Sequence, residues 1–397
     1  MLMRSLLAAA VALALLGSAA PAPAQVWVPA WTASAMPERG DLDRAGEPLQ
    51  FADQTVRQDL QLASAASAIR IRFSNELGAA PLVLGEATAG LRGGPVTPVQ
   101  FNGASAVTIP VGASLLSDPI PLDIPAFADL TVSVYLPEPT RPAVRLTAVR
   151  VGPGRDAVPD SVRLERRQSV ISAILAERET APAAVIVAFG DSLTEGNSTT
   201  LGANKTWPSQ LARRLEARCP GEYVVLNAGI GGNMVASNGR SPSALARLDR
   251  DVLSLPGITH LILLEGLNDI RQKGTTRDRA GAPAETVIAG YGQIIDRLRL
   301  HEIEVLGGLL TPILAVSFEP VIEGPSTDDK RRALNAFIRD AGAFDAVVDF
   351  DTAIQDPAHP ERIRPGAHRE DGYHPNDEGH RLMAEAVDLS LFGCGSR

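Results

Sequence analysis

The chain changes its pattern of apolar residues near residue 180, and this change constrains the fold more than any other feature. Before it, short runs alternate apolar with polar side chains, and Gly, Pro and Asn separate the runs. A repeat of two residues places successive side chains on opposite faces of a strand. The runs are Ile69–Phe73, Leu82–Leu84, Val107–Val111 and Leu130–Leu136. They predict an antiparallel β-sandwich or jelly-roll domain over residues 25–175.

After residue 180, short apolar runs alternate with longer amphipathic stretches. The clearest predicted helices are Ser209–Arg218 and Gly379–Leu391. The predicted strands are Val185–Phe189, Tyr223–Asn227, Ile258–Glu265, Glu304–Leu310 and Ala346–Phe350. Five strands with helices between them are typical of a doubly wound α/β domain with a parallel sheet. We assign this domain to residues 185–397 and expect a linker at 176–184.

The first 24 residues have the features of a secretory signal peptide. Arg4 supplies the positive end, and Leu6–Leu16 is an apolar run of 11 residues, shorter than the ~20 that span a bilayer. Ala22-Pro23-Ala24 is a small-residue cleavage site, so the mature chain is expected to begin at Gln25. The alternative is an uncleaved anchor helix. Cleavage predicts a secreted or periplasmic protein.

Charge and composition exclude several classes of partner. The formal net charge is −9, and no run of Lys and Arg forms a basic stripe. Binding nucleic acid requires clustered cations, so no nucleic-acid partner is expected. No later segment is long and apolar enough to insert into a membrane. No Cys-x-x-Cys or His-Glu-x-x-His motif is present, so no zinc site is expected either.

Two predicted strands end in motifs that can carry chemistry. In an open parallel sheet, functional residues collect at the carboxyl ends of the strands. The first strand ends in Gly190-Asp191-Ser192-Leu193, where a turn can expose a nucleophilic hydroxyl; alternatively, the serine caps the next helix. The second ends in the glycine-rich run Asn227–Asn233. Met234 replaces the third glycine of a dinucleotide fingerprint. A plain turn or backbone N–H donors for an oxyanion remain.

Two further motifs follow later in the chain. Gly266-Leu267-Asn268-Asp269 ends the third strand, and the Asn268 amide can donate to an oxyanion or form an Asx turn. Asp371 precedes His374 by three positions in a loop bounded by Gly and Pro. A carboxylate can hold the imidazole while its other nitrogen faces a nucleophile. His380 is expected to be a solvated or capping residue of the following helix.

Taken together, these four motifs resemble those of the SGNH (GDSL) hydrolase superfamily over roughly residues 183–397. The resemblance implies a flavodoxin-like sheet, Ser192 as nucleophile, and His374 with Asp371 as its base. It also implies an oxyanion hole formed by Ser192, Gly232 and Asn268, although Gly229 or Gly231 could replace Gly232. The β-rich first half, with Trp31-Thr32-Ala33-Ser34 near the mature start, resembles two-domain bacterial members of the superfamily.

The resemblance implies a serine ester hydrolase that works through an acyl-enzyme, needs no metal or organic cofactor, and has a small-molecule or glycan ester as its expected partner. We expect it to remove short, acetyl-like groups from carbohydrate or aryl esters, because the loops after the strands contain no long apolar stretch. Two alternatives remain. One is a lipolytic esterase or lysophospholipase that acts on longer acyl chains, and the other is an acyltransferase that uses the same triad.

The only two cysteines, Cys219 and Cys394, follow the first and the last predicted helix of the α/β domain. Crossover helices in a parallel sheet end at the edge opposite the active site. In a flavodoxin-like sheet the first and last helices also share a face, so we predict a Cys219–Cys394 disulfide. The alternative is two free thiols.

Overall fold

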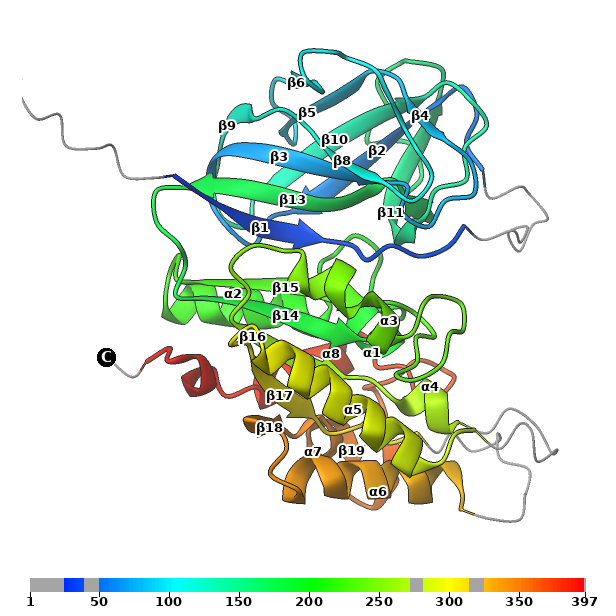
Figure 1. Ribbon diagram of the computed structural model, residues 1–397, viewed down its shortest axis with the longest axis vertical. Helices are drawn as coiled ribbons and strands as arrows, with labels where there is room; N and C mark the ends of the chain where they lie inside the picture. Colours follow the sequence, from blue (N-terminus) through cyan, green and yellow to red (C-terminus); the bar gives the residue numbers. More distant parts are fainter. Residues whose placement is uncertain (1–24, 39–49, 272–280, 314–324, 396–397) are drawn as a thin grey trace, which may run out of the picture.

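The computed structural model describes residues 25–38, 50–271, 281–313 and 325–395, and shows a β-rich body stacked on an α/β body (Figure 1). The predicted signal peptide, residues 1–24, lies outside the described residues. Within those residues, no helix is both long and apolar enough to cross a membrane.

Two antiparallel sheets form the N-terminal body. The five-stranded sheet contains β1 (Val26–Thr32), β13 (Ile171–Arg178), β3 (Ala66–Ser74), β8 (Ser114–Leu116) and β9 (Ile120–Ile124). The six-stranded sheet runs in the order β12 (Glu165–Ser169), β11 (Val144–Pro153), β2 (Gln54–Gln61), β10 (Asp129–Leu136), β5 (Ala87–Leu91) and β6 (Thr97–Val99). A small separate ladder pairs β4 (Leu82–Leu84) with β7 (Val107–Ile109).

The two sheets share one apolar core, which follows from the alternating sequence. Every second residue of β10, from Leu130 to Leu136, is buried, and the residues between them are half-buried. These side chains join Ile69, Ile71 and Phe73 of β3 in a single cluster. The predicted antiparallel β domain is therefore confirmed.

The C-terminal body contains one parallel sheet, in the order β15 (Tyr223–Gly229), β14 (Ala184–Gly190), β16 (His260–Leu264), β17 (Glu304–Gly308) and β18 (Ala346–Val348). The second strand along the chain is thus at the edge and the first beside it, which is the flavodoxin-like order. Helices α2 (Trp207–Arg218) and α8 (Asp377–Ala386) contact each other, as do α5 (Ala284–Arg299) and α6 (Thr327–Asp340). The predicted doubly wound fold is confirmed.

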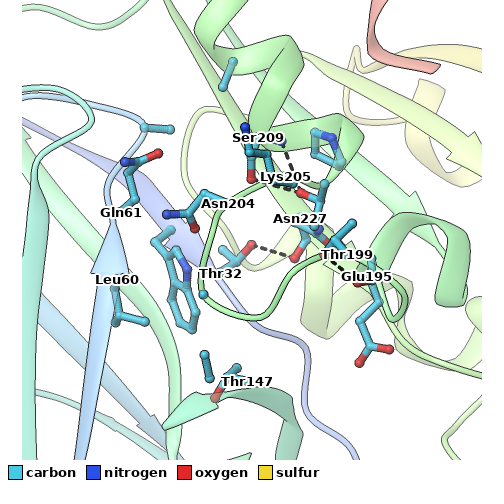
Figure 2. Close-up of a pocket in the computed structure, with 18 of the residues that line it drawn as sticks. Thr32, Leu60, Gln61, Thr147, Glu195, Thr199, Asn204, Lys205, Ser209 and Asn227 are labelled. Carbon is cyan, nitrogen blue, oxygen red and sulfur yellow. Dashed lines mark hydrogen bonds between the residues drawn. The ribbon is translucent and has the colours of Figure 1, made fainter. Parts of the chain in front are cut away.

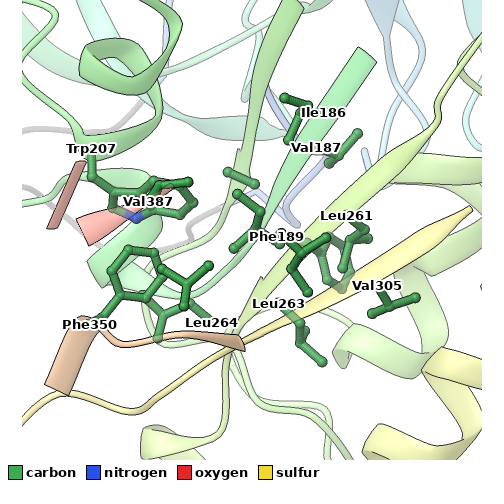
Figure 3. Close-up of a cluster of buried hydrophobic side chains, with 14 of the residues drawn as sticks. Ile186, Val187, Phe189, Trp207, Leu261, Leu263, Leu264, Val305, Phe350 and Val387 are labelled. Carbon is green, nitrogen blue, oxygen red and sulfur yellow. The ribbon is translucent and has the colours of Figure 1, made fainter. Parts of the chain in front are cut away.

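Apolar side chains from the strands and helices of this body form a second core. β14 is buried along its whole length because helices cover the sheet. Figure 3 shows Phe189 and Leu264 from the strands near Trp207 and Phe350 from the helical side. The Trp207 and Phe350 rings pack with their centroids 5.0 Å apart, so the start of α2 is fixed against α7 (Phe350–Ile354).

Several predicted boundaries differ from those in the structure, and two of them concern the domain border and the last helix. The linker expected at 176–184 is reduced to residues 179–183, because β13 pairs with β1 as far as Arg178 and β14 begins at Ala184. The helix expected over Gly379–Leu391 ends at Ala386, where Val387 adopts an extended backbone. The Arg214 guanidinium donates to the carbonyls of Ala384 and Val387, and these contacts satisfy the end of the helix.

The predicted disulfide between Cys219 and Cys394 is present, with Cα atoms 6.1 Å apart. Cys219 directly follows α2, and Cys394 follows a short 3₁₀ helix, Leu389–Phe392. Nearby, the Tyr223 hydroxyl donates to the Phe392 carbonyl over 2.9 Å. The C-terminal segment is therefore fixed at the amino ends of the strands.

The N-terminal body lies along the outer strand of the parallel sheet. β1 packs beside β15 (Figure 1). Arg213 of α2 donates to the Gln61 side chain over 2.6 Å, and Arg178 donates to the Gly221 carbonyl over 2.7 Å. The sheet edge is thus covered by the neighbouring domain, which is one way in which proteins protect exposed strands.

Candidate active site

Ser192 is the first residue of α1 (Ser192–Glu195), and only Asp191 separates it from the end of β14. Asp191 is the helix cap, since its Oδ1 accepts the Leu193 N–H over 2.9 Å. The alternative in which the serine caps this helix is therefore wrong. Gly190 is required by packing, because a Cβ there would lie 2.2 Å from the Leu264 carbonyl oxygen.

The structure brings Ser192, His374 and Asp371 together in a chain of hydrogen bonds. The Ser192 Oγ lies 2.9 Å from His374 Nε2. The other ring nitrogen, Nδ1, lies 2.8 Å from Asp371 Oδ2. Asp371 Oδ1 also accepts the backbone N–H of His374 over 3.0 Å. The carboxylate can therefore hold the imidazole with Nδ1 protonated and Nε2 free to accept the serine proton.

Burial and hydrogen bonding set the charges of this pair. Burial lowers the pKa of His374, and the hydrogen bond and charge of Asp371 oppose that shift only in part. Burial acts to raise the pKa of Asp371, but hydrogen bonds from His374 outweigh it and leave this pKa below its usual value. At neutral pH the imidazole is therefore neutral and the carboxylate is charged, as a general base and its partner require.

The three residues expected to form an oxyanion hole lie at three strand ends. Gly232 follows β15 with φ +79°, a conformation that favours glycine. A Cβ on Gly231 would lie 4.0 Å from the Ser192 Cβ, so this glycine also borders the nucleophile. Asn268 Nδ2 donates to Asp191 Oδ2 and to the Asn233 carbonyl, both over 3.0 Å. One of these bonds must give way before the amide can donate to a substrate.

Residues 188–382 match the family model described as the GDSL-like Lipase/Acylhydrolase family. The C-terminal domain belongs to this family. The match includes Ser192, Gly232, Asn268, Asp371 and His374. The domain is thus that of a hydrolase that acts on esters.

Solved structures that match the chain each cover about half of it. An acetyl xylan esterase, AlAXEase, is 22% identical with a TM-score of 0.40, and the match covers 51% of this chain and 96% of that one. Est24, a carbohydrate acetylesterase from Sinorhizobium meliloti, is 17% identical with a TM-score of 0.39, over 51% and 95% of the two chains. A GDSL-like lipase from Bacteroides thetaiotaomicron VPI-5482 is 19% identical with a TM-score of 0.38, over 53% and 88%. No curated protein matches the chain.

A buried arginine organises the carboxyl edge of the sheet in this GDSL-like domain. Arg247 is 0% exposed, and its guanidinium donates to the Ala228 carbonyl over 2.7 Å and to the Gly190 carbonyl over 3.0 Å. It also donates to the Asn233 side chain over 2.7 Å and pairs with Asp251 at 3.1 Å. Arg247 therefore joins two strand ends to the glycine-rich loop. The sequence analysis missed it; the only signal was its spacing of four residues from Asp251.

Asp269, the last residue of the third motif of the GDSL-like domain, fixes the same loop. Its carboxylate accepts the backbone N–H groups of Val235 over 2.8 Å and Ala236 over 3.1 Å. Behind the site, burial raises the pKa of Asp191 to about 7, and the Leu193 N–H opposes the shift only in part. The carboxyl edge of the sheet thus contains the acidic side chains of Asp191 and Asp269, which are both buried away from solvent.

Two more side chains contact His374 or its helix. The Tyr373 ring lies 4.1 Å from the imidazole, centroid to centroid, and its hydroxyl accepts from Arg271 over 3.1 Å. His380 is only 1% exposed, and its Nδ1 accepts the Trp207 N–H over 3.1 Å. The expectation that His380 is solvated is therefore wrong, and burial lowers its pKa to about 3. Among the described residues, no three His, Cys, Asp or Glu side chains are placed to hold a metal ion.

Proposed function

We propose that this chain is an exported esterase that removes acetyl or other short acyl groups from carbohydrate or aryl esters. The observation that carries the proposal is the chain of hydrogen bonds from Ser192 through His374 to Asp371, in a domain of an ester hydrolase family.

The proposed mechanism assigns a role to each of these residues. Ser192 Oγ attacks the ester carbonyl while His374 Nε2 takes its proton, and Asp371 stabilises the imidazolium that forms. The oxyanion is held by the backbone N–H groups of Ser192 and Gly232 and by the Asn268 amide. The imidazolium then protonates the leaving alcohol. Water, activated by the same histidine, hydrolyses the acyl-enzyme and releases the acid.

Charged side chains around the nucleophile support a short acyl group and a polar alcohol. Arg271 stacks over the Tyr373 ring, with its guanidinium carbon 4.7 Å from the ring centroid. Glu195 Oε2 would lie 2.8 Å from a Cβ on Gly231, on the same side as Ser192. A long alkyl chain needs an apolar channel, and placing it against the half-buried Arg271 would strip water from this charge at a cost in free energy. A sugar hydroxyl can instead hydrogen-bond to polar side chains of this kind.

Two observations support export. The N-terminal residues have the pattern of a cleavable signal peptide. The Cys219–Cys394 disulfide belongs to the kind of bond that persists in oxidising compartments such as the periplasm or the extracellular medium.

The test is a hydrolysis panel of 4-nitrophenyl esters from two to twelve carbons, run beside acetylated xylan. We expect kcat/KM to be highest for the two-carbon ester and free acetate to appear from the glycan without any acceptor alcohol. Faster cleavage of the twelve-carbon ester would contradict the short-chain proposal. Acetate release that depends on an added acceptor alcohol would favour the acyltransferase.

A further inference from the structure

A cavity of about 150 Å³ lies between the two domains, beside the loop that follows α1 (Figure 2). The N-terminal domain contributes residues of β1, β2, β11 and β12, and the GDSL-like domain contributes residues 195–206 and the edge strand β15. A cavity of this volume is large enough for one six-membered ring. The site is assembled only when both domains are present.

The N-terminal domain places a buried arginine in the wall of this cavity. Arg145 is 8% exposed, and its Nε has no hydrogen-bond partner among the described residues. Its Nη2 makes only two long contacts, each 3.4 Å, to the carbonyls of Thr32 and Asn227. Burial lowers the pKa of Arg145, and the charge of Glu195 opposes the shift only in part. A buried guanidinium with unused donor capacity is unusual, because buried charges are normally paired.

A second arginine lines the cavity from the neighbouring strand. Arg166 of β12 pairs with Ala148 of β11, and both line the cavity. Burial lowers the pKa of Arg166 as it does that of Arg145, and the charge of Glu195 opposes the shift of both only in part. Two guanidinium groups present planar pairs of donors, which match the two oxygens of a carboxylate.

The positive charges in the wall exceed the negative ones. Lys205 adds a third cation. Asp59 already pairs with Arg57 at 3.0 Å and Arg150 at 2.9 Å. Glu195 is the other carboxylate of the lining. An anionic group on a ligand would therefore complement this wall.

The rest of the lining suits a polyhydroxylated ring. Trp31 and Phe127 provide apolar surface. Amide and hydroxyl side chains supply hydrogen-bond donors and acceptors; they include Thr32, Gln61, Thr147, Thr199, Asn204 and Ser209. Figure 2 shows Gln61 and Asn204 facing each other from the two domains. Apolar surface combined with convergent polar groups is typical of a small-molecule site.

The loop that lines the cavity is connected to the segments that carry the nucleophile and the base, although neither residue itself lines the cavity. Glu195 in its wall is three residues after Ser192, and a Cβ on Gly231 would lie within 4.0 Å of both side chains. On the other side of the loop, Thr200 donates from its backbone and its hydroxyl to Asp377, over 2.8 and 2.7 Å. Asp377 is three residues after His374. A ligand in the cavity would thus contact a loop anchored to both.

From these observations we infer that the interdomain cavity binds one acidic sugar ring, a hexuronate, with Arg145 and Arg166 holding its carboxylate. This inference rests on the proposed function and deepens it: the favoured substrate is an acetylated glycan that contains uronate units. The N-terminal domain then supplies specificity rather than only support.

Binding to the Ser192→Ala protein, measured by isothermal titration calorimetry, tests the cavity without any catalysis. We expect D-glucuronate or D-galacturonate to bind at least about tenfold more tightly than D-glucose, since charged hydrogen bonds to arginine are lost with the neutral sugar. Arg166→Gln, introduced into the same protein, should remove this preference. Arg163→Gln is the matched control, because Arg163 is on the same hairpin but its side chain is 85% exposed.

Three outcomes would overturn the inference: equal binding of glucuronate and glucose, no binding of either, or an unchanged preference in Arg166→Gln. Sulfate that binds as tightly as glucuronate would also overturn it, because the cavity would then be a general anion site. Circular dichroism establishes that each variant is folded. Loss of the esterase activity in the hydrolysis panel would contradict the proposed function alone, since these titrations need no turnover.

Discussion

The two edges of the parallel sheet differ in what their side chains do. At the carboxyl edge, burial raises the pKa of Asp191 to about 7 and holds that of Glu265 well above its usual range. Arg247 lies among them, fully buried. At the amino edge, a disulfide and the Tyr223 hydrogen bond fix the end of the chain. Buried charges cost folding free energy unless they are paired, so the carboxyl edge serves the reaction at some cost in stability, whereas the amino edge adds stability without taking part in the reaction.

The largest expected effect at the carboxyl edge is on activity alone. Ser192→Ala should lower kcat by about 10⁴-fold or more, because nothing else can form the acyl-enzyme. The midpoint of urea unfolding should stay near that of the wild type, since the half-buried hydroxyl bonds only to His374 among the described residues. Ser254→Ala, at an exposed serine, is the control and should keep full activity. Near-normal turnover by folded Ser192→Ala would remove Ser192 as the nucleophile.

The amino edge should show the opposite behaviour. Replacing Cys219 and Cys394 together with serine should lower the free energy of unfolding by about 2–5 kcal/mol, mainly because the unfolded chain gains freedom. At 25 °C, where the variant remains folded, kcat should not change. Urea titration and steady-state kinetics on the same preparation measure both. A clear fall in kcat of the folded variant would show that the two edges are not independent.

A smaller effect at the carboxyl edge concerns the oxyanion. Asn268→Ala should lower kcat by roughly 10²–10³-fold with little change in KM, because the amide contributes most in the transition state. The reference is the wild-type enzyme with 4-nitrophenyl acetate. If KM alone rises, the two bonds from Asn268 to Asp191 and Asn233 hold the loop and do not stabilise the oxyanion.

A buried histidine near the carboxyl edge should also make the free energy of unfolding depend on pH. His380 has a pKa of about 3 in the fold and about 6.5 when unfolded. The unfolded chain therefore binds one more proton between these values, and stability falls as the pH drops through this range. The loss from pH 7 to pH 4 should be about 3 kcal/mol.

The His380→Asn variant isolates this effect, because an asparagine oxygen can accept the Trp207 N–H in place of Nδ1. Its unfolding free energy, measured by urea titration at several pH values, should depend less steeply on pH. The exposed His359→Asn variant is the control and should keep the wild-type slope. An unchanged slope in His380→Asn would mean that the buried imidazole titrates normally.

The features that could be predicted from the sequence are those that depend on local pattern and on the topology of the sheet. Ser192, Gly232 and Asn268 could be placed together because strand ends of a parallel sheet share one edge. His374 could be placed beside them only through the resemblance to a known family. Arg247 could not be found this way, since its partners at Gly190, Ala228 and Asn233 are brought close only by the fold.

Other features depend on packing between distant segments. His380 was expected to be solvated or to cap its helix, because nothing near it in the sequence indicates that its Nδ1 accepts the N–H of the distant Trp207. Arg145 has no local signal at all; its position in the interdomain cavity depends on how β11 meets β15. The early end of α8 likewise depends on a distant residue. Arg214 of α2 donates hydrogen bonds to the carbonyls of Ala384 and Val387 at that end.

The disulfide also gives the chain a covalent topology. It closes a ring across 175 residues, from Cys219 to Cys394, that contains Asp371 and His374 but not Ser192. A single proteolytic cut inside the ring leaves both fragments joined by the disulfide, so a chain cut there remains one covalent molecule. A cut at residues 179–183 lies outside the ring and would release the β-rich domain from the hydrolase domain as a separate polypeptide.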